Sequence, residues 1–198
     1  MTYEDFYGPA LTGLTKTKQQ ICDLISLYSS ENPDHAKSVI YCCSRLKTPE
    51  SMIQKLKKRG LPVNKQAALS QVYDAVGIRV VCSFAEDVYQ IAAWLKNRAE
   101  FRILEEKDYI AYPKPNGYRS LHLLLQMTEG EGSGLFAEIQ IRTIAIDFWA
   151  ALEHQLKYKK NLPHEAMIRE ELKRCADEIA SVDLSMQTIR DILRESSP

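Results

Sequence analysis

The sequence has no net charge: its 26 lysines and arginines balance 26 aspartates and glutamates. Proteins that bind nucleic acid mainly through bulk charge carry a clear excess of basic residues. The balance therefore argues against such a protein. Local basic patches remain compatible with it, so nucleic acid is a partner that the composition allows but does not indicate.

Cysteine pairs with metal-site spacing and long apolar runs are also missing. The five cysteines are an odd number, and no two of them have zinc-finger spacing. Reduced thiols in the cytosol are the expected state. No basic region followed by an apolar run opens the sequence, and no apolar run approaches the roughly 20 residues that span a bilayer. We therefore expect a cytoplasmic protein without a signal peptide or a membrane partner.

The common nucleotide and metal motifs are absent as well. The sequence has no Walker lysine loop, no G-x-G-x-x-G and no protein-kinase signature. Its four histidines lack metal-ligand spacing, and none is followed by an aspartate, the dipeptide that one class of metal-dependent phosphohydrolases uses. These absences disfavour the common nucleotide-binding folds.

Hydrophobic periodicity predicts a mixture of helices and strands. The expected helices cover residues 9–28, 48–59, 85–98, 143–160 and about 163–195. The expected strands cover residues 76–84, 101–105, 121–127 and 135–141. Thr48 is the expected cap of the second helix, and Ser83 with Glu86 is expected to form a capping box before the third. This order predicts a single α+β domain over residues 1–198, with a mixed β-sheet surrounded by helices.

The last helix has a regular apolar seam. Its members follow alternating steps of four and three residues: Ile168, Leu172, Cys175, Ile179, Val182, Met186, Ile189 and Leu193. Such a seam packs either against the rest of its own domain or against another chain. The sequence leaves both alternatives open.

The stretch from residue 108 to residue 122 joins two predicted strands and is longer than a usual hairpin connection. Four turn-forming residues are expected to fix its backbone: Pro113, Pro115, Asn116 and Gly117. The loop also carries basic side chains and an aromatic ring: Lys114, Arg119, His122 and Tyr118. Cations beside an aromatic ring suit a phosphorylated base. An ordinary polar surface loop is the alternative.

Two carboxylates lie at predicted strands. Asp74 precedes the first strand, and Glu138 lies on the polar face of the last one beside Gln140 and Arg142. Mg²⁺ prefers carboxylate oxygens, and a carboxylate can also take a proton from an attacking hydroxyl. Alone, Asp74 would be interpreted as an ordinary acid at the start of a strand.

Basic residues from separate segments accompany these acids. The early helices, the first strand and the long loop supply them: Arg45, Lys47, Lys55, Lys58, Arg59, Arg79 and Lys114. Their convergence with two acids at one end of a sheet would suit phosphoryl transfer, in which the protein mainly positions groups and neutralises charge. Whether Asp74 and Arg79 share a face stays open, because Gly77 between them allows a bulge.

Five motifs in family order resemble the synthetase domain of the RelA/SpoT family, and in particular its small stand-alone alarmone synthetases. They span roughly residues 45–159: SRLKTPES at 44–51, DAVGIR at 74–79, YPKPNGYRSLH at 112–122, EIQIRT at 138–143, and FWAALEH at 148–154 with KYK at 157–159.

The resemblance implies a nucleotidyltransferase-like sheet and a defined reaction. The β,γ-pyrophosphate of ATP passes to the ribose 3′-hydroxyl of GTP or GDP, with GMP as a further candidate acceptor. AMP is released and (p)ppGpp is formed. By the same resemblance Asp74 holds the cofactor Mg²⁺, and Glu138 either shares the metal or activates the 3′-hydroxyl.

The resemblance also implies two nucleotide subsites. Arg45 and Arg79 lie on either side of adenine. The ATP phosphates are assigned to Lys47, Lys55 and either Lys58 or Arg59. Tyr118 stacks on the acceptor guanine. The other acceptor-side residues are Lys114, His122, Gln140 and Asp147. Some relatives have Asn in place of Asp147, and a carboxylate cannot donate a hydrogen bond to guanine O6.

The length of 198 residues leaves no room for the hydrolase and regulatory domains of the long family members, so synthesis without hydrolysis is expected. Small members resemble homotetramers, in agreement with the C-terminal seam. Two alternatives remain: a toxin-type relative that pyrophosphorylates the tRNA 3′ end, and a nucleotide- or RNA-binding module without catalysis. The pair Asp74 and Glu138 argues against the second, because a binder needs no paired acids in a phosphate site.

Overall fold

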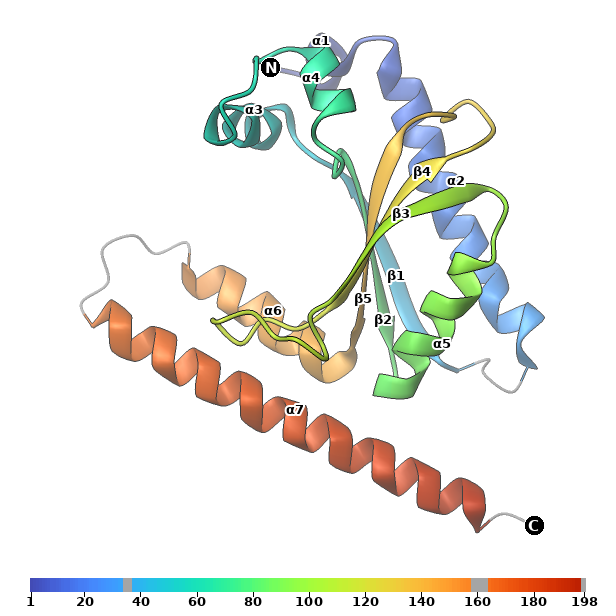
Figure 1. Cartoon of the computed structure of the whole chain (residues 1–198), viewed down its shortest axis with the longest axis vertical. Helices are drawn as coiled ribbons and strands as arrows, with labels where there is room; N and C mark the ends of the chain where they lie inside the picture. Colours follow the sequence, from blue (N-terminus) through green and yellow to red (C-terminus); the bar gives the residue numbers. More distant parts are fainter. Residues whose placement is uncertain (34–36, 158–163, 197–198) are drawn as a thin grey trace.

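A five-stranded mixed sheet forms the centre of the computed structural model, which describes residues 1–33, 37–157 and 164–196. The strands lie in the order β1-β2-β5-β4-β3 (Figure 1). Their bounds are β1 Val39–Leu46, β2 Val76–Cys82, β3 Phe101–Asp108, β4 Leu121–Met127 and β5 Phe136–Thr143. Neighbours pair antiparallel except β2 and β5, which are parallel. The predicted mixed sheet is therefore confirmed.

Helices cover the sheet unevenly. Their bounds are α1 Tyr3–Tyr7, α2 Ala10–Glu31, α3 Pro49–Lys58, α4 Lys65–Ser70, α5 Ala85–Lys96, α6 Ile144–Lys157 and α7 Glu165–Glu195. Figure 1 shows α2 and α5 against one face of the sheet and α3 and α4 at one end of the molecule. Helices α6 and α7 lie on the side of the sheet away from α2 and α5 (Figure 1). Among the described residues, no helix is both long and apolar enough to cross a membrane.

Alternation along the strands directs apolar side chains to the face under α2 and α5. In β5, Ala137, Ile139 and Ile141 are fully buried, whereas Glu138 and Gln140 between them are partly exposed. Strand β4 repeats the pattern with Leu121, Leu123 and Leu125 in the same core. Because side chains of a strand alternate between the two faces, the opposite face is left polar and open to ligands.

The sequence patterns missed three elements, α1, β1 and α4. The correction that matters is β1, because Arg45 was assigned to an early helix and lies on this edge strand instead. Its residues from Val39 to Cys43 are all apolar, so the sequence lacks a period-two signal there, although burial alternates from Tyr41 to Leu46. Lys47 follows the strand, and its backbone N–H donates to the carbonyl of Ala75 at 2.8 Å.

The helix caps were predicted in part. The Thr48 side chain accepts from the Ser51 N–H, as expected for the start of α3. The capping box of α5 is different: the Asp87 carboxylate accepts from the Phe84 N–H at 3.1 Å, while the Ser83 hydroxyl donates to the carbonyl of Lys37. The predicted end of α6 beyond Lys157 lies outside the described residues.

The seam of α7 has two different halves. Its first four members, from Ile168 to Ile179, are partly buried, and three of them pack with Trp149 of α6. The second half is open, with Val182, Met186, Ile189 and Leu193 between 49% and 63% exposed. The helix therefore packs on its own domain over the first half, and its second half keeps an exposed apolar stripe.

Candidate active site

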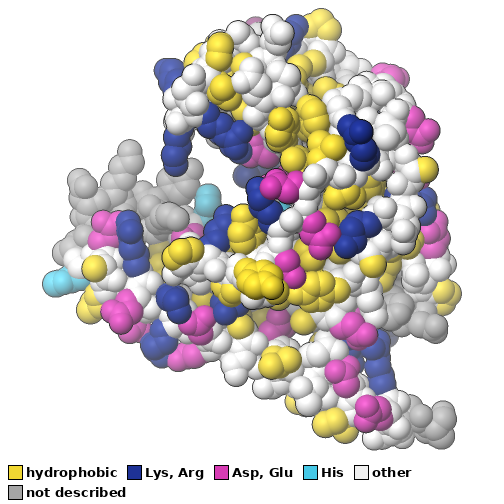
Figure 2. Space-filling view, in the orientation of Figure 1, with side chains coloured by type: hydrophobic (Ala, Val, Ile, Leu, Met, Phe, Trp, Pro, Cys, Tyr) yellow, Lys and Arg dark blue, Asp and Glu magenta, His cyan; other side chains and the backbone are white. Residues whose placement is uncertain are grey.

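Two cavities on the polar face of the sheet meet at Asp74 and Glu138. The first is about 220 Å³ and is lined by Lys55, Arg59, Tyr73, Asp74, Glu105, Lys107, His122, Leu124 and Glu138. The second is about 240 Å³ and is lined by Cys43, Ser44, Arg45, Asp74, Gly77, Ile78, Arg79, Glu138 and Gln140. Figure 2 shows Lys and Arg side chains gathered where this face is hollowed. The predicted convergence of acids and cations thus holds for most of the set.

Asp74 lies in the turn before β2 and is held by two lysines. Its Oδ2 accepts from Lys55 Nζ of α3 at 2.6 Å and lies 3.0 Å from Lys47 Nζ. Its Oδ1 is buried and has no hydrogen-bond partner among the described residues. A buried carboxylate oxygen without a partner is costly, so this atom is suited to a ligand that brings positive charge.

The donor set also limits which cation could bind. No group of three or more His, Cys, Asp or Glu residues in the described part of the chain could hold a metal ion. A fully protein-ligated site of the zinc or calcium kind is therefore not formed there. Mg²⁺ commonly takes one or two carboxylates and fills its other positions with water and substrate phosphates, which fits Asp74 and Glu138.

Glu138 begins a chain of polar contacts that runs into the long loop. Its Oε1 lies 3.3 Å from His122 Nδ1, and its Oε2 accepts from Gln140 Nε2 at 2.8 Å. The other ring nitrogen of His122, Nε2, lies 2.8 Å from the Tyr118 hydroxyl. The antiparallel pairing of β4 with β5 places His122 opposite Gln140 and so brings these groups together.

Burial alone raises the pKa of Glu138, but the hydrogen bond and charge of His122, the hydrogen bond from Gln140 and the charge of Lys55 lower it to about 2. The carboxylate is therefore ionised at neutral pH. A general base works best with a pKa near the working pH, so this group is better suited to holding a cation than to taking a proton.

Arg142 joins the two sides of the site, and the sequence patterns gave it no role. Its guanidinium is buried and donates to the Tyr118 hydroxyl at 2.7 Å, to Gln140 Oε1 at 2.8 Å and to Asp147 Oδ1 at 3.1 Å. The alternation of β5 had placed it on the face of Glu138 and Gln140. That placement was the one sequence feature that could have indicated a role for Arg142, because charged residues are seldom buried without partners.

Asp147 is surrounded by donors from three elements. Besides Arg142, its Oδ1 lies 3.4 Å from Arg79 Nη1, and its Oδ2 accepts a hydrogen bond from the Tyr41 hydroxyl of β1. The pairing of β1 with β2 passes Gly77 without a register shift. No bulge interrupts β2, and Arg79 lies on the same wall of the second cavity as Gly77 and Arg45.

The long loop has the fixed backbone that its turn formers predict. Asp108 Oδ1 accepts from the N–H groups of Ile110 and Ala111, both at 2.9 Å. Gly117 has a φ of +87°, a conformation that favours glycine. Lys114 Nζ lies 4.9 Å from the centre of the Tyr118 ring, so the loop does bring a cation onto an aromatic face.

Some predicted residues lie away from the two cavities. Lys58 is exposed on α3 and lines neither of them, whereas Arg59 lines the first. Lys114, Tyr118 and Asp147 form a neighbouring group that reaches the cavities through His122 and Gln140. The first cavity also has walls that the sequence did not indicate, among them the Glu105–Lys107 ion pair at 2.8 Å.

Comparison with known proteins finds relatives along nearly the whole chain. A family model described as the region found in RelA/SpoT proteins matches residues 44–162. The GTP pyrophosphokinase YwaC of Bacillus subtilis is 38% identical over 188 residues, which cover 93% of this chain and 87% of YwaC. The GTP pyrophosphokinase YjbM of the same organism is 32% identical over 200 residues, which cover 98% and 91% of the two chains.

Solved structures agree with these sequence matches. The small alarmone synthetase 1 of B. subtilis bound to its product pppGpp superposes with a TM-score of 0.82 and 27% identity, over 93% of this chain and 96% of that one. The small alarmone synthetase 2 of B. subtilis superposes with a TM-score of 0.80 and 35% identity, over 91% and 96%. The predicted α+β class with a long C-terminal helix is thereby confirmed.

Proposed function

The chain belongs to the RelA/SpoT family, and from this premise we propose that it is a GTP pyrophosphokinase that makes (p)ppGpp. It transfers the β,γ-pyrophosphate of ATP to the 3′-hydroxyl of GDP or GTP. The observation that carries the proposal is the meeting of two cavities, each lined by basic and acidic side chains, at Asp74 and Glu138. Transfer of a charged phosphoryl group requires cations and acids at one centre, with space for a nucleotide base beside it.

Asp74 and Glu138 together hold Mg²⁺ in this proposal. The buried, unpartnered Oδ1 of Asp74 and the ionised carboxylate of Glu138 support that assignment. When bound, the ion would neutralise charge on the phosphates of ATP and on the oxygen that leaves with AMP. The remaining ligands would come from water and from the substrate, as is usual for Mg²⁺.

ATP occupies the second cavity with its base and the shared centre with its phosphates. Arg45 and Arg79 extend from the adjacent strands β1 and β2 and line that cavity, an arrangement suited to stacking on both faces of adenine. Lys47, Lys55 and Arg59 are assigned to the phosphates. Arg59 is preferred over Lys58 because it lines the first cavity.

The acceptor is assigned to the group around Tyr118. Its ring is the proposed platform for guanine, with Lys114 and His122 on the acceptor phosphates and Gln140 beside them. Asp147 is proposed to act differently from the Asn of some relatives. Since it already contacts Arg142, Arg79 and Tyr41, it would orient those side chains rather than read the base.

The reaction follows from positioning and charge. The acceptor 3′-oxygen attacks the β-phosphorus of ATP, and the bond from that phosphorus to the oxygen bridging the α-phosphate breaks. That oxygen leaves with AMP, and the proton of the 3′-hydroxyl passes to solvent. Lys47, Lys55 and Arg59 stabilise the negative charge that develops along this line, which is the main protein contribution in phosphoryl transfer.

The exposed half of the α7 seam supports a homo-oligomer, with a tetramer as the specific expectation. Four apolar side chains in regular spacing are a surface that a second copy can bury. Ile189→Glu changes an exposed position and should leave the fold intact. We expect it to lower the mass measured by light scattering, and an unchanged mass would remove this stripe from the interface.

A labelled-substrate assay tests the function. Purified protein receives ATP labelled in its β or γ phosphate, Mg²⁺ and one acceptor at a time: GTP, GDP, GMP or tRNA. We expect a labelled guanine nucleotide together with AMP. Label on tRNA alone would instead support the toxin-type alternative. Absence of transfer to every acceptor would contradict both enzymatic functions and leave nucleotide or RNA binding without catalysis.

A further inference from the structure

The helix α7 touches the loop that carries Tyr118 at an unusually close point. Gly117 is buried there, and a Cβ atom built on it would lie 2.6 Å from the Cβ of Ala176 and 3.4 Å from the Cα of Lys173. Two carbon atoms need well over 3 Å, so only a glycine on the loop and a small residue on the helix allow this approach. The loop is thus packed against the helix backbone.

Arg119 joins the same two segments with hydrogen bonds. Its Nη2 donates to Asp177 Oδ1 of α7 at 3.0 Å, and its Nη1 donates to the carbonyls of Gly117 at 3.1 Å and Ala176 at 3.4 Å. Its side chain is only 15% exposed. The guanidinium is occupied by the helix and by its own loop, and the proposed reaction gives it no contact with a nucleotide.

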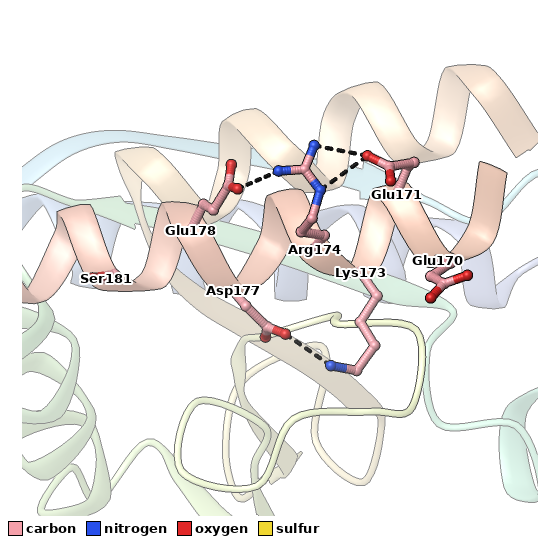
Figure 3. Close-up of a pocket in the computed structure, with 7 residues that line it drawn as sticks. All are labelled: Glu170, Glu171, Lys173, Arg174, Asp177, Glu178 and Ser181. Carbon is pink, nitrogen blue, oxygen red and sulfur yellow. Dashed lines mark hydrogen bonds and ion pairs between the residues drawn. The ribbon is translucent and has the colours of Figure 1, made fainter. Parts of the chain in front are cut away.

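The solvent side of α7 is separate from this contact. Figure 3 shows Lys173 and Asp177 extending toward the loop, while Arg174 lies on another side of the helix between Glu171 and Glu178. The pair Lys173–Asp177 thus lies on the side of α7 that faces the loop, whereas the ion pairs of Arg174 do not (Figure 3). Substitutions in the second set can therefore serve as controls for substitutions in the first.

Packing continues the contact to the proposed guanine platform. Trp149, Ala150 and Ala176 form a small buried cluster, and the Tyr118 ring packs against it. The indole Nε1 of Trp149 donates to the carbonyl of Leu172 at 2.8 Å, which fixes α6 to α7 beside that ring. Tyr118 is thus supported by a cluster to which α6 contributes Trp149 and Ala150 and α7 contributes Ala176, while its hydroxyl accepts a hydrogen bond from Arg142.

We propose that Arg119 and Ala176 are positioning residues for the acceptor nucleotide: through them α7 fixes the loop that presents Tyr118. The inference rests on the proposed function, because it takes Tyr118 as the acceptor platform. The C-terminal helix is far in sequence from Asp74 and Glu138. By this inference it nevertheless determines the affinity for the acceptor. ATP binding should depend on it much less, since the ATP cavity is lined by β1, the turn before β2, β2 and the middle of β5, and by no residue of α7.

The test measures binding and turnover separately. Asp177→Asn keeps the size of an exposed side chain while weakening the contact to Arg119, and Glu178→Gln is its control on the same helix. Ala176→Val pushes on the loop, and Ala166→Val is its exposed control. We expect Asp177→Asn and Ala176→Val to raise the KM and the Kd for GDP about tenfold, with the KM for ATP changed less than about twofold. Asp177→Glu should restore most of the affinity.

The outcomes separate this inference from the proposed function. A wild-type protein that binds GDP but transfers nothing would overturn the function alone, and the GDP titrations would still decide the inference. Equal effects on GDP and ATP, or equal effects of the control variants, would show a merely structural contact and overturn it. A wild-type protein that binds no guanine nucleotide would overturn it as well. If Ala176→Val fails to fold, Asp177→Asn and its control give the answer.

Discussion

Arg142 and Tyr118 are joined by a hydrogen bond of 2.7 Å from the guanidinium to the phenol. The same guanidinium contacts Asp147, which in turn lies 3.4 Å from Arg79 on the opposite side of the site. A buried arginine therefore links the proposed acceptor platform to an arginine of the proposed ATP cavity. The two proposed subsites therefore share one polar network.

Replacing Arg142 should damage both stability and acceptor binding. Arg142→Met leaves the buried Asp147 with Arg79 and Tyr41 as partners. We expect the free energy of unfolding to fall by about 2–3 kcal/mol. This is less than the roughly 3–5 kcal/mol lost when a buried charge loses its sole partner. The KM for the acceptor should rise more than the KM for ATP. Urea unfolding and steady-state kinetics measure the two effects, and an unchanged acceptor KM would contradict the link to Tyr118.

Glu138→Gln should slow transfer strongly while nucleotide binding survives. The substitution keeps the size of the side chain but removes the charge that His122 and Lys55 stabilise. One carboxylate oxygen becomes an NH₂ group, so the contacts with His122 and Gln140 are not both kept as they are. We expect kcat to fall by about 10²–10³, as for loss of one strong electrostatic contact at a reacting centre. Glu105→Gln, on the wall of the first cavity, is the matched control and should retain activity. Unchanged turnover of Glu138→Gln would remove this residue from the mechanism.

Two substitutions of Tyr118 separate its ring from its hydroxyl. Tyr118→Ala should weaken acceptor binding by about 1–3 kcal/mol, the usual contribution of a base stack, and leave ATP binding nearly unchanged. Tyr118→Phe keeps the ring and loses the hydroxyl contacts to Arg142 and His122. We expect this variant to weaken acceptor binding by about 1 kcal/mol. Calorimetric titration with each nucleotide measures both. Equal losses for ATP and acceptor would refute the assignment of the ring to guanine.

Removal of Mg²⁺ should stop transfer. Treatment with a chelator is expected to abolish activity, and added Mg²⁺ should restore it. Asp74→Asn should raise the Mg²⁺ concentration that gives half-maximal activity, because the variant lacks the charge of a proposed ligand. Activity that persists after chelation would contradict the metal assignment of both carboxylates.

Asp183 should make the protein less stable as the pH rises. Burial raises its pKa above the ordinary 3.8, and the hydrogen bond from Thr143 lowers it only in part. The folded state therefore holds this proton more tightly than the unfolded state, and stability is lost as the pH rises through the raised pKa. We expect Asp183→Asn to be more stable than the wild type at pH 7 and the difference to narrow below about pH 4. Thermal melts at the two pH values measure it.

The sequence predicted those parts of the fold whose signal is local. The bounds of β4 agree with the prediction, and α3 begins at its Thr48 cap, because alternation and capping act within a few residues. Strand β1 was missed because its first five residues, Val39 to Cys43, are all apolar, so the sequence shows no alternation although burial alternates from Tyr41 to Leu46. Arg142 had no assigned role because its partners Tyr118 and Asp147 come from a loop and a helix that only the tertiary fold brings to β5.

The sequence likewise indicated some residues of the candidate site and not others. Residue types at motif positions indicated Asp74, Glu138 and the arginines of the second cavity before any geometry was known. The choice between Lys58 and Arg59 depended on how α3 is turned against the sheet, which adjacent residues in a basic run cannot reveal. The hydrogen bond from Arg119 to Asp177 of α7 could not be predicted from the sequence either, because Asp177 lies 58 residues further along the chain.

The two lysines on Asp74 have a consequence for the order in which charge enters the site. Lys47 and Lys55 both contact Oδ2 of this carboxylate, while Oδ1 has no partner among the described residues. A free cation that approaches Oδ1 meets two ammonium groups nearby, which weakens its binding there. In the proposed reaction the phosphates of ATP would attract both lysines away from Asp74. A cation that arrives bound to ATP should therefore bind Asp74 more tightly than a free cation.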